Sequence, residues 1–591
     1  MATRRTATLC LVLVFVAPLM CRTVARTIYL DATGGSDSNN GLSPDTAWRT
    51  FANLPGQLQP GDRVLLKRGE QWRATLTAPA SGTVDRPIVF AAYGNGPLPV
   101  ISAADAVSGW DLLQENIWRA QVPVRPRVLY VILQDGSLLH GQGVKNTDRL
   151  EQELQYCWQA GVLYMYCALQ PDIAFRSVEA GQRDCAVSDG QITRSYLVFQ
   201  HLELRGANAE WGGAIDFRGY GGPITLEECH IRMNASMGVM MVNSGARVSG
   251  CAILHCLGGS LLVHTEAAGW LVEDCELAYS FSGVSLYGPS AVLQGNHIHH
   301  HRMNGIFIVS SGHTIRYNAV HDNGQADYED FGDMTQKFEL YSGGGDANSI
   351  YYNLFYNGSP HGGAGIYLDN GTAGCLLANN VICNMSEGTP ANPHGIGYVL
   401  ENGFGITQNN HFLNNICANC RVAVAFADDI GANNLQGNRF DFNCYFLGDI
   451  GESVAYADGF KDLSAWQDMA GHPDTHSMAA DPLFVSPGWA RFGCSCADYH
   501  LQACSPCINQ GTCLGLAYDF AGTQVPYGAF PEIGAYEFTG LLCPDINRDG
   551  YVNSLDAGSL LSAWYSADIL SDLDQNGLVN QLDLLLLLQT L

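Results

Sequence analysis

The chain has 591 residues, of which 47% are apolar and 15% are charged, so it contains ample material for a large hydrophobic core. Lys and Arg number 30 against 57 Asp and Glu, giving a formal charge of −27 at neutral pH. This balance argues against a nucleic-acid partner, because phosphate binding depends on basic side chains. The 66 glycines and the Asn-rich turns favour an all-β protein with many short strands.

Residues 1–25 have the pattern of a signal peptide. Arg4 and Arg5 precede an apolar run, and small residues stand at Thr23 and Ala25. We therefore expect a secreted, extracellular protein that begins near Arg26 after processing. No later apolar stretch reaches the roughly 20 residues that a membrane helix needs. The sequence predicts a protein without a membrane span, and we expect a monomer.

A repeat of about 22 residues, lengthened twice by insertions, runs through the middle of the chain. Each copy has an alternating strand and then a Cys or Asn at the same bend. A period of this length without intervening helices predicts a parallel β-helix, in which every coil buries its inner side chains on its neighbours. The bend positions are Cys229, Cys251, Cys275, Asn296, Asn318, Asn353, Asn379, Asn414 and Asn438.

Both ends of this region carry further motifs. Residues 27–31 and 34–44 open it, and residues 480–484, 498–501 and 534–537 close it. Together with the repeat they resemble secreted right-handed β-helix proteins of the pectate-lyase-like superfamily, over roughly residues 27–538. The resemblance implies a right-handed helix that forms one domain over residues 26–540. It leaves the chemistry open, because the superfamily contains polysaccharide lyases, glycoside hydrolases and epimerases. Residues 122–190 fit the repeat poorly, and we expect them to form either an insertion or irregular coils.

Residues 541–591 contain two copies of one acidic loop, placed 27 residues apart. Oxygen-bearing side chains at loop positions 1, 3, 5, 9 and 12, a Gly at 6 and a backbone carbonyl at 7 are the ligand set of a Ca²⁺ loop. The predicted ligands are Asp545, Asn547, Asp549, Tyr551, Asn553 and Asp556, then Asp572, Asp574, Asn576, Leu578, Asn580 and Asp583. Asp at position 12 resembles a type I dockerin. The resemblance implies a small α-helical module with helices over residues 555–564 and 582–591 and a cohesin-type partner domain.

Paired carboxylates are the strongest catalytic candidates. When the second strand of each coil is aligned with its neighbours by the flanking glycines, alternate positions of these strands fall on the outer face of the helix. Asp369 and Glu401 then occupy equivalent strand ends on adjacent coils, about 4.8 Å apart, close to the 5–5.5 Å typical of a retaining glycosidase. Glu339 is the reserve carboxylate, about 8 Å from Asp369 by strand geometry, within the inverting range.

The leading functional hypothesis is a glycoside hydrolase that acts on a polysaccharide along the helix groove. Asp369 and Glu401 would serve as nucleophile or base and as general acid. Outward residues on neighbouring coils would line the substrate subsites: Arg218, His264, Tyr287 and Tyr341.

Two other functions remain open. A Ca²⁺-assisted lyase acting on a uronate polymer needs a strong base, for which Lys337 and Arg218 are available. A second Ca²⁺ in the groove would then be held by Asp327, Asp330, Asp333 and Asp346. The third reading is a non-catalytic carbohydrate-binding or adhesive β-helix displayed through its Ca²⁺ module.

Two further clusters are interpreted as structural. His297, His299, His300 and His301 straddle a coil bend, so we expect their side chains to scatter in direction. The closely spaced cysteines of the last coils favour disulfides or free thiols over zinc, because no His stands at ligand spacing. These cysteines are Cys494, Cys496, Cys504, Cys507 and Cys513.

Overall fold

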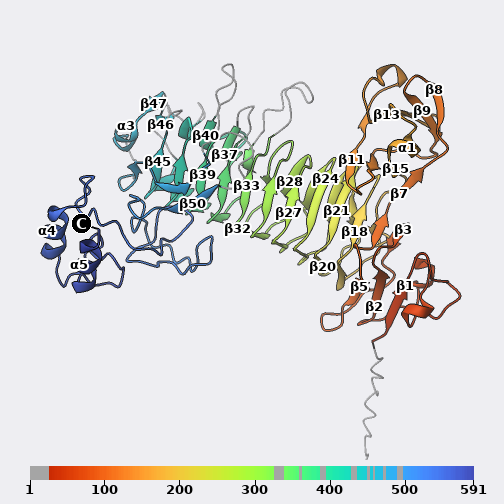
Figure 1. Cartoon of the computed structure of the whole chain (residues 1–591), viewed down its shortest axis with the longest axis horizontal. Coiled ribbons are helices and arrows are strands. Elements are labelled where there is room, and N and C mark those ends of the chain that lie inside the picture. The colour runs from red at the N-terminus through yellow and green to blue at the C-terminus, as the bar shows by residue number, and fades with distance from the viewer. Residues whose placement is uncertain are drawn as a thin grey trace, which may run out of the picture.

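A computed structural model describes the chain from residue 25 to residue 590. The description omits residues 325–337, 359–362, 386–394, 427–435, 449–452, 457–458, 470–473 and 489–496. The described residues form an elongated stack of coils with a lobe near its N-terminal end and a small helical module at its C-terminal end (Figure 1).

Three long parallel sheets run the length of the stack, and each coil contributes one strand to each sheet. The prediction of a parallel β-helix is therefore confirmed. Sheet 1 contains β1 (Thr27–Leu30), β2 (Arg63–Lys67), β5 (Ile88–Tyr93), β17 (Leu197–Gln200), β20 (Ile224–Glu227), β23 (Arg247–Ser249), β26 (Leu271–Glu273), β29 (Val292–Gln294), β32 (Thr314–Arg316), β35 (Ser349–Tyr351), β38 (Leu376–Ala378), β41 (His411–Leu413) and β44 (Arg439–Asp441).

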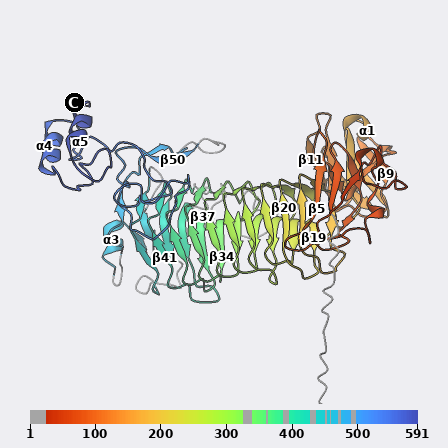
Figure 2. The same cartoon turned by 90° about the horizontal axis from the view of Figure 1, so that it is seen from below.

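Sheet 2 contains β3 (Gln71–Arg73), β6 (Val100–Ser102), β18 (Glu203–Arg205), β21 (His230–Asn234), β24 (Ala252–Cys256), β27 (Glu276–Ala278), β30 (His297–His299), β33 (Ala319–His321), β36 (Leu354–Tyr356), β39 (Val381–Cys383), β42 (Ile416–Ala418), β45 (Cys444–Phe446) and β48 (Met478–Ala479). Sheet 3 contains β4 (Leu76–Thr77), β16 (Val187–Ser188), β19 (Gly213–Phe217), β22 (Met237–Met241), β25 (Gly259–Val263), β28 (Ser282–Leu286), β31 (Ile306–Ile308), β34 (Phe338–Gly343), β37 (Gly363–Asp369), β40 (Gly395–Leu400), β43 (Val422–Phe426), β46 (Ser453–Tyr456) and β47 (Phe460–Lys461). Figure 2 shows the successive strands side by side along the stack.

The core lies inside the coils. Alternate residues of every strand point inward, and in one coil Leu226, Ile231 and Val239 are fully buried. The same positions in the next coil continue each layer, as Val248, Ile253 and Leu261 do. Since each buried Leu, Ile or Val side chain contributes roughly 1.5–3 kcal/mol by leaving water, the stack is stabilised mainly by these repeated apolar layers.

Stacked side chains also satisfy the bends between the sheets. The Nδ2 of Asn296 donates to Oδ1 of Asn318 at 2.9 Å, and Asn318 donates likewise to Asn353 at 3.0 Å. This ladder continues through Asn380, Asn415 and Asn443. The predicted members Asn379, Asn414 and Asn438 lie elsewhere, so that part of the register is wrong. Asn438 belongs to a separate ladder with Asn410, and the other two donate to the C-terminal segment.

An antiparallel lobe interrupts the early coils, in the region where the repeat fits poorly. It extends from Ala104 to Gly181 and therefore begins before residue 122. One sheet contains β11 (Leu138–His140), β10 (Leu129–Ile132), β15 (Ser177–Gly181) and β7 (Ala104–Val107). The other contains β12 (Gln142–Gly143), β13 (Gln155–Gln159), β14 (Val162–Tyr166), β9 (Ile117–Gln121) and β8 (Asp111–Gln114).

Helices are short and few among the described residues. They are α1 (Pro171–Ala174), α3 (Leu463–Gln467), α4 (Ser554–Ser562) and α5 (Gln581–Leu588), with 3-10 turns η1 (Pro44–Thr46), η2 (Phe51–Asn53) and η3 (Thr147–Arg149). The antiparallel strands β49 (Phe484–Ser486) and β50 (Asp498–Leu501) precede a segment that packs on the outer face of the last strands of sheet 2. Ile508 and Ile533 of this segment share a core with Val381 and Ile416.

Candidate functional site

The outer face of sheet 3 carries a row of aromatic side chains. Phe307, Tyr341 and Tyr367 are register partners on β31, β34 and β37. The rings of Phe307 and Tyr341 stack with centroids 5.4 Å apart, and Tyr341 meets Tyr367 edge to face at 5.5 Å. This aromatic row lies directly beside the strand ends that bear the predicted carboxylates.

Asp369 and Glu401 occupy equivalent positions on adjacent coils, as expected. Leu368 pairs with Leu400, and each acidic residue directly follows one of these two leucines. One coil spacing separates the two positions, which corresponds to about 4.8 Å between backbones. Asp369 is 9% exposed, whereas Glu401 is half-buried. The two carboxyl groups therefore differ in their access to solvent.

The phenol of Tyr341 holds the carboxylate of Asp369. Its Oη donates to Oδ2 of Asp369 at 2.8 Å and accepts from Nδ2 of Asn370 at 3.1 Å. Burial raises the pKa of Tyr341, and the hydrogen bond to Asp369 and the charges of Asp369 and Glu401 raise it further. Tyr341 thus stays protonated at neutral pH and remains a donor to the carboxylate.

The turn after β40 closes against this carboxylate. Gly403 has φ of +45°, and a Cβ at this position would lie 2.4 Å from Oδ1 of Asp369, so only glycine fits. The backbone N–H of Phe404 donates to Oδ1 of Asn370 at 3.0 Å. The ring of Phe404 is fully exposed. Sequence reasoning did not single out Asn370 or Phe404, although both stand in the two Asn-Gly turns that follow the acidic residues.

Glu339 does not face the outer surface, so that prediction is wrong. It is 1% exposed, and its carboxyl group accepts hydrogen bonds from the backbone N–H and the side-chain amide of Asn323. Burial raises its pKa well above the usual value for Glu. Glu339 thus continues a buried ladder of hydrogen-bonded side chains at the coil bends, after His301 and Asn323. A break in the alternation of β34 explains the error, because Phe338 packs with Tyr341 and Tyr367 while Glu339 and Leu340 are both buried.

The other predicted subsite residues lie along the same edge of sheet 3 but further away. Arg218, His264 and Tyr287 follow β19, β25 and β28, which are six, four and three coils before β37. These separations correspond to roughly 29, 19 and 14 Å. Arg218 forms a bidentate ion pair with Asp216, with both N···O distances at 2.8 Å. Lys337 lies outside the described residues.

Arg218 and Asp216 line a cavity of about 380 Å³ near the N-terminal end of sheet 3. Asp184, Asp189 and the indole of Trp211 also line it, and Trp211 is largely exposed. This cavity is therefore separate from the pair formed by Asp369 and Glu401.

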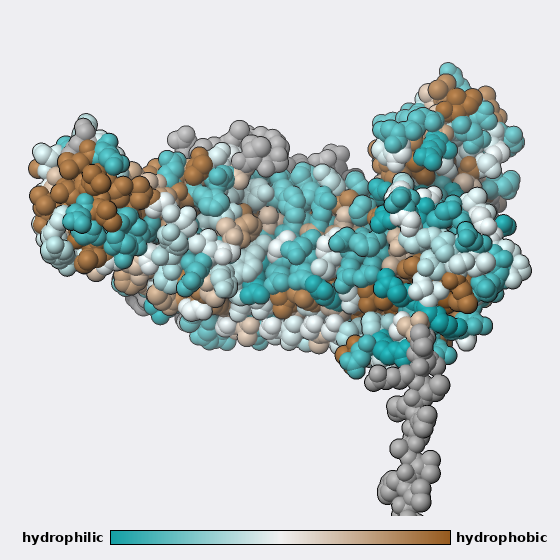
Figure 3. Space-filling model, turned by 60° about the horizontal axis from the view of Figure 1, so that its bottom comes forward, coloured by the Kyte–Doolittle hydropathy of each residue, from teal (hydrophilic) through white to brown (hydrophobic). Residues whose placement is uncertain are grey.

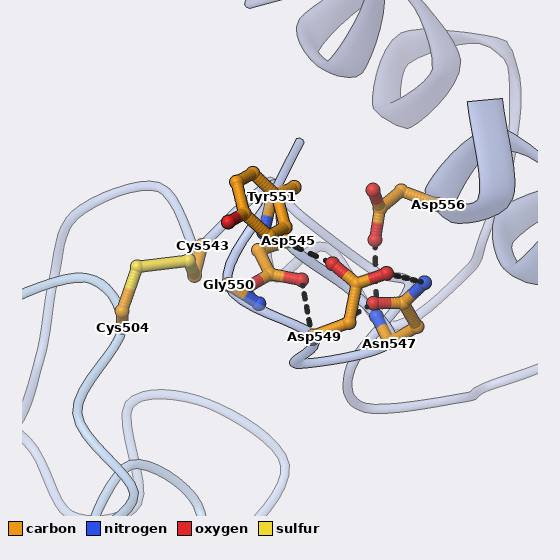
Figure 4. The surroundings of a disulfide bond; sticks show 8 residues. All are labelled: Cys504, Cys543, Asp545, Asn547, Asp549, Gly550, Tyr551 and Asp556. Carbon is orange, nitrogen blue, oxygen red and sulfur yellow. Dashed lines mark hydrogen bonds between the residues drawn. A yellow bond between two sulfur atoms is a disulfide. The ribbon is translucent and has the colours of Figure 1, made fainter. Parts of the chain in front are cut away.

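The two acidic loops of the C-terminal module have the same internal geometry. In the first, the carboxylate of Asp545 accepts from the N–H groups of Asp549 and Gly550, and Asp556 accepts from those of Asn547 and Asn553 (Figure 4). The second loop repeats these bonds at Asp572 and Asp583. Each loop leads into a helix, α4 or α5, whose first turn contains the position-12 Asp.

Three carboxylates converge in the second loop. Ligand oxygens of Asp572, Asp574 and Asp583 all lie within 4.8 Å of one another. Burial and the neighbouring carboxylates of Asp574 and Asp583 raise the pKa of Asp572. Such a concentration of negative charge fits a cation with oxygen ligands, so the donor set is compatible with Ca²⁺.

A disulfide between Cys504 and Cys543 joins the module to the last segment of the body (Figure 4). Leu542 and Leu573 extend the same apolar core across this junction. Cys507 is buried and Cys513 is exposed, both as free thiols, and Cys494 and Cys496 lie outside the described residues.

Residues 261–459 match the family model described as the right handed beta helix region. No curated protein sequence matches the chain. A solved structure described as the complex of XylC with xylose is 13% identical, with a TM-score of 0.60 over 87% of this chain and 98% of that chain. A glycoside hydrolase is 13% identical, with a TM-score of 0.45 over 64% and 97%. A pectate lyase is 16% identical, with a TM-score of 0.44 over 87% and 97%. The likeness to the XylC structure and the family-model match show the fold: the chain is a right-handed parallel β-helix.

Proposed function

We propose that the protein is a secreted polysaccharide-degrading enzyme, a glycoside hydrolase whose catalytic pair is Asp369 and Glu401. The observation that carries this proposal is their equivalent placement on adjacent coils. A spacing of about 4.8 Å between coils lies near the separation of about 5–5.5 Å found in retaining glycosidases.

The surroundings of the two carboxyl groups support a different role for each. Asp369 is held in place by the hydroxyl of Tyr341, which suits a nucleophile that must stay oriented. Glu401 is more exposed, which suits the group that first protonates the leaving oxygen and then deprotonates water. The exposed ring of Phe404 offers an apolar face against which a sugar ring can stack.

The test compares Asp369→Asn and Glu401→Gln with Glu228→Gln, a matched change in an exposed turn of a distant coil. A reducing-end assay over a polysaccharide panel identifies the substrate first. We expect both site variants to lose at least about a thousandfold in kcat and the control to keep wild-type rates. Wild-type rates in both site variants would overturn the proposal.

The lyase alternative receives less support from the described residues. Of its two candidate bases, Arg218 is held by Asp216, and a guanidinium in an ion pair is a poor base. Lys337 and the acidic residues Asp327, Asp330 and Asp333 lie outside the described residues. Asp346 accepts a hydrogen bond from the backbone of Ala373. Release of unsaturated uronate products would favour the lyase, and binding without turnover would favour an adhesive β-helix.

We also propose that the C-terminal module binds two Ca²⁺ ions and docks onto a cohesin-type partner domain. The paired loops support the first part. The second is supported by leucines that the helices leave at least half exposed, such as Leu555, Leu561, Leu582, Leu585 and Leu588. Figure 3 shows hydrophobic surface gathered on this module. Pull-down with a cohesin domain, with and without chelator, tests this partner.

Export to the extracellular space is part of the same proposal. The Cys504–Cys543 disulfide supports it, because such bonds persist in oxidising compartments. Among the residues that the structure describes, no helix is long and apolar enough to cross a membrane. Detection of the processed N-terminus near Arg26 in culture medium tests the assignment of residues 1–25 as a signal peptide.

A further inference from the structure

A cluster of imidazoles lies on the outer face of sheet 2, away from both sites described above. His299 and His321 are register partners on β30 and β33, and their rings stack in parallel with centroids 5.1 Å apart. His300 directly follows His299, and Asp322 directly follows His321. A His-His pair on one coil therefore lies next to a His-Asp pair on the adjacent coil. His297 completes the cluster, with its Nε2 2.6 Å from Nε2 of His321.

These side chains converge, contrary to the prediction that they scatter. One ligand atom from each of His300, His321 and Asp322 lies within 4.8 Å of the others. Nδ1 of His299 lies 2.8 Å from Nδ1 of His300. His301 alone follows the structural interpretation, because its ring is buried in a bend ladder between Ser280 and Leu277.

We propose that this cluster binds one divalent transition-metal ion of the Zn²⁺ class, with His300, His321 and Asp322 as protein ligands. Imidazole nitrogen with one carboxylate oxygen is a donor set that such ions prefer, whereas Ca²⁺ prefers oxygen alone. Ligand atoms around a tetrahedral Zn²⁺ lie about 3.3 Å apart, given bonds of about 2.0–2.1 Å. The three ligand atoms, all within 4.8 Å of one another, already lie near that spacing.

One further observation supports a cation here. Nε2 of His299 is buried, in a side chain 6% exposed, and has no hydrogen-bond partner among the described residues; its nearest acid is Glu276 at 3.7 Å. A buried nitrogen without a partner is costly, and a bound ion or its water would satisfy it.

The position of the cluster gives an ion access from solvent. The C-terminal segment covers the outer face of sheet 2 from β36 onward, where Leu354, Val381 and Ile416 are apolar. His321 stacks on Tyr356 at the border of this cover, with centroids 4.4 Å apart. Tyr279 of the preceding coil packs against the rings of His299 and His300. His297 is exposed, so solvent reaches the cluster beside this residue.

The experiment titrates the full chain with Zn²⁺ by calorimetry, after metal removal and in excess Ca²⁺ so that the acidic loops are filled. Co²⁺ serves as a spectroscopic probe of nitrogen ligands. The test variants are His300→Asn and His321→Tyr. Tyr356 is the residue one coil beyond His321, and Asn357 stands two coils beyond His300. The matched control is His230→Ala, an exposed outer-face residue of β21 whose partner on the next coil is Ala252.

We expect one Zn²⁺ per wild-type chain beyond any bound by the loops, with affinity at least about tenfold weaker in each variant and about a hundredfold weaker in the double variant. The control should bind as the wild type does. Circular dichroism establishes that each variant is folded. Equal Zn²⁺ affinity in the folded double variant, or no Zn²⁺ uptake by the wild type, would overturn the proposal.

Discussion

The phenol of Tyr341 donates a hydrogen bond of 2.8 Å to the carboxylate of Asp369 across one coil of sheet 3. The two residues are not register partners, since Tyr341 pairs with Tyr367 and Asp369 with Gly343. The tyrosine therefore reaches two residues along the sheet to fix a carboxylate at the strand end. The missing side chain at Gly343 leaves room for this approach, because a Cβ there would lie 2.8 Å from the Tyr341 ring.

Removal of the Tyr341 hydroxyl should impair catalysis without unfolding the protein. A hydrogen bond to a charged group is worth about 1.5–3 kcal/mol, so Tyr341→Phe should lower kcat about ten- to a hundredfold. The matched control is Tyr351→Phe, whose hydroxyl accepts from Arg316 on sheet 1. Equal kcat in Tyr341→Phe and wild type would show that the bond does not assist the reaction.

How far the sequence predicts the site is clear from the three acidic residues Asp369, Glu401 and Glu339. The turns after Asp369 and Glu401 both read Asn-Gly, which aligned these coils correctly. The prediction for Glu339 is wrong because the insertion before β34 leaves no glycine directly in front of this strand by which to align it with its neighbours. Two consecutive residues, Glu339 and Leu340, are buried in this strand, and a pattern that assumes strict alternation of inward and outward side chains cannot predict such a break.

The ladder of Asn side chains at the coil bends is also difficult to align from the sequence. Asn379-Asn380 and Asn414-Asn415 are pairs of identical neighbours, and only Asn380 and Asn415 continue the ladder from Asn353. The imidazole cluster was missed for a related reason. His321 and Asp322 complete it from the next coil, so its convergence depends on the register between coils rather than on local spacing.

The exposed ring of Phe404 should contribute to substrate binding alone. Phe404→Ala should raise KM several-fold, because an aromatic contact is worth about 0.5–1.5 kcal/mol, while kcat stays unchanged. Its thermal stability should match the wild type, since the side chain is fully exposed. Leu112→Ala, at an exposed position of β8, is the control for loss of surface apolar area. A fall in kcat with unchanged KM would contradict this role.

His301 should make the stability of the fold sensitive to acid. Burial lowers its pKa to about 4 from 6.5, so the unfolded chain takes up a proton that the folded chain refuses as pH falls between these values. The stabilisation present above pH 6.5 is thereby lost toward pH 4, by about 3 kcal/mol. Asn323 occupies the same ladder one coil later, so His301→Asn can keep the bonds without the titrating ring.

We therefore expect His301→Asn to have a shallower fall in denaturation midpoint between pH 7 and pH 4 than the wild type. The matched control is His411→Asn, at an exposed position of β41, which should keep the wild-type slope. Chemical denaturation at several pH values measures both. Identical slopes in His301→Asn and wild type would show that this ring does not govern the acid response.

Calcium should stabilise the C-terminal module without taking part in catalysis. Asp572, Asp574 and Asp583 hold their oxygens close together, and Ca²⁺ would relieve their mutual repulsion. Calorimetry should detect two Ca²⁺ ions per chain with dissociation constants below about 1 mM. The double variant Asp545→Ala, Asp572→Ala should lose both ions, because it deletes the first ligand of each loop. Asp111→Ala, an exposed acidic residue of β8, should bind as the wild type does.

The same double variant separates the hydrolase from the lyase. Asp369 and Glu401 need no metal in the proposed mechanism, so the variant should keep wild-type turnover in the presence of chelator. The module shares a core with the last coils through Leu542 and Leu573, so the loss of Ca²⁺ should lower the melting temperature of the double variant. The activity of the variant at 25 °C should persist. If chelator abolishes turnover in this loop-deficient variant and Ca²⁺ restores it, a second calcium site lies in the β-helix. The lyase would then replace the hydrolase as the better account of the chemistry.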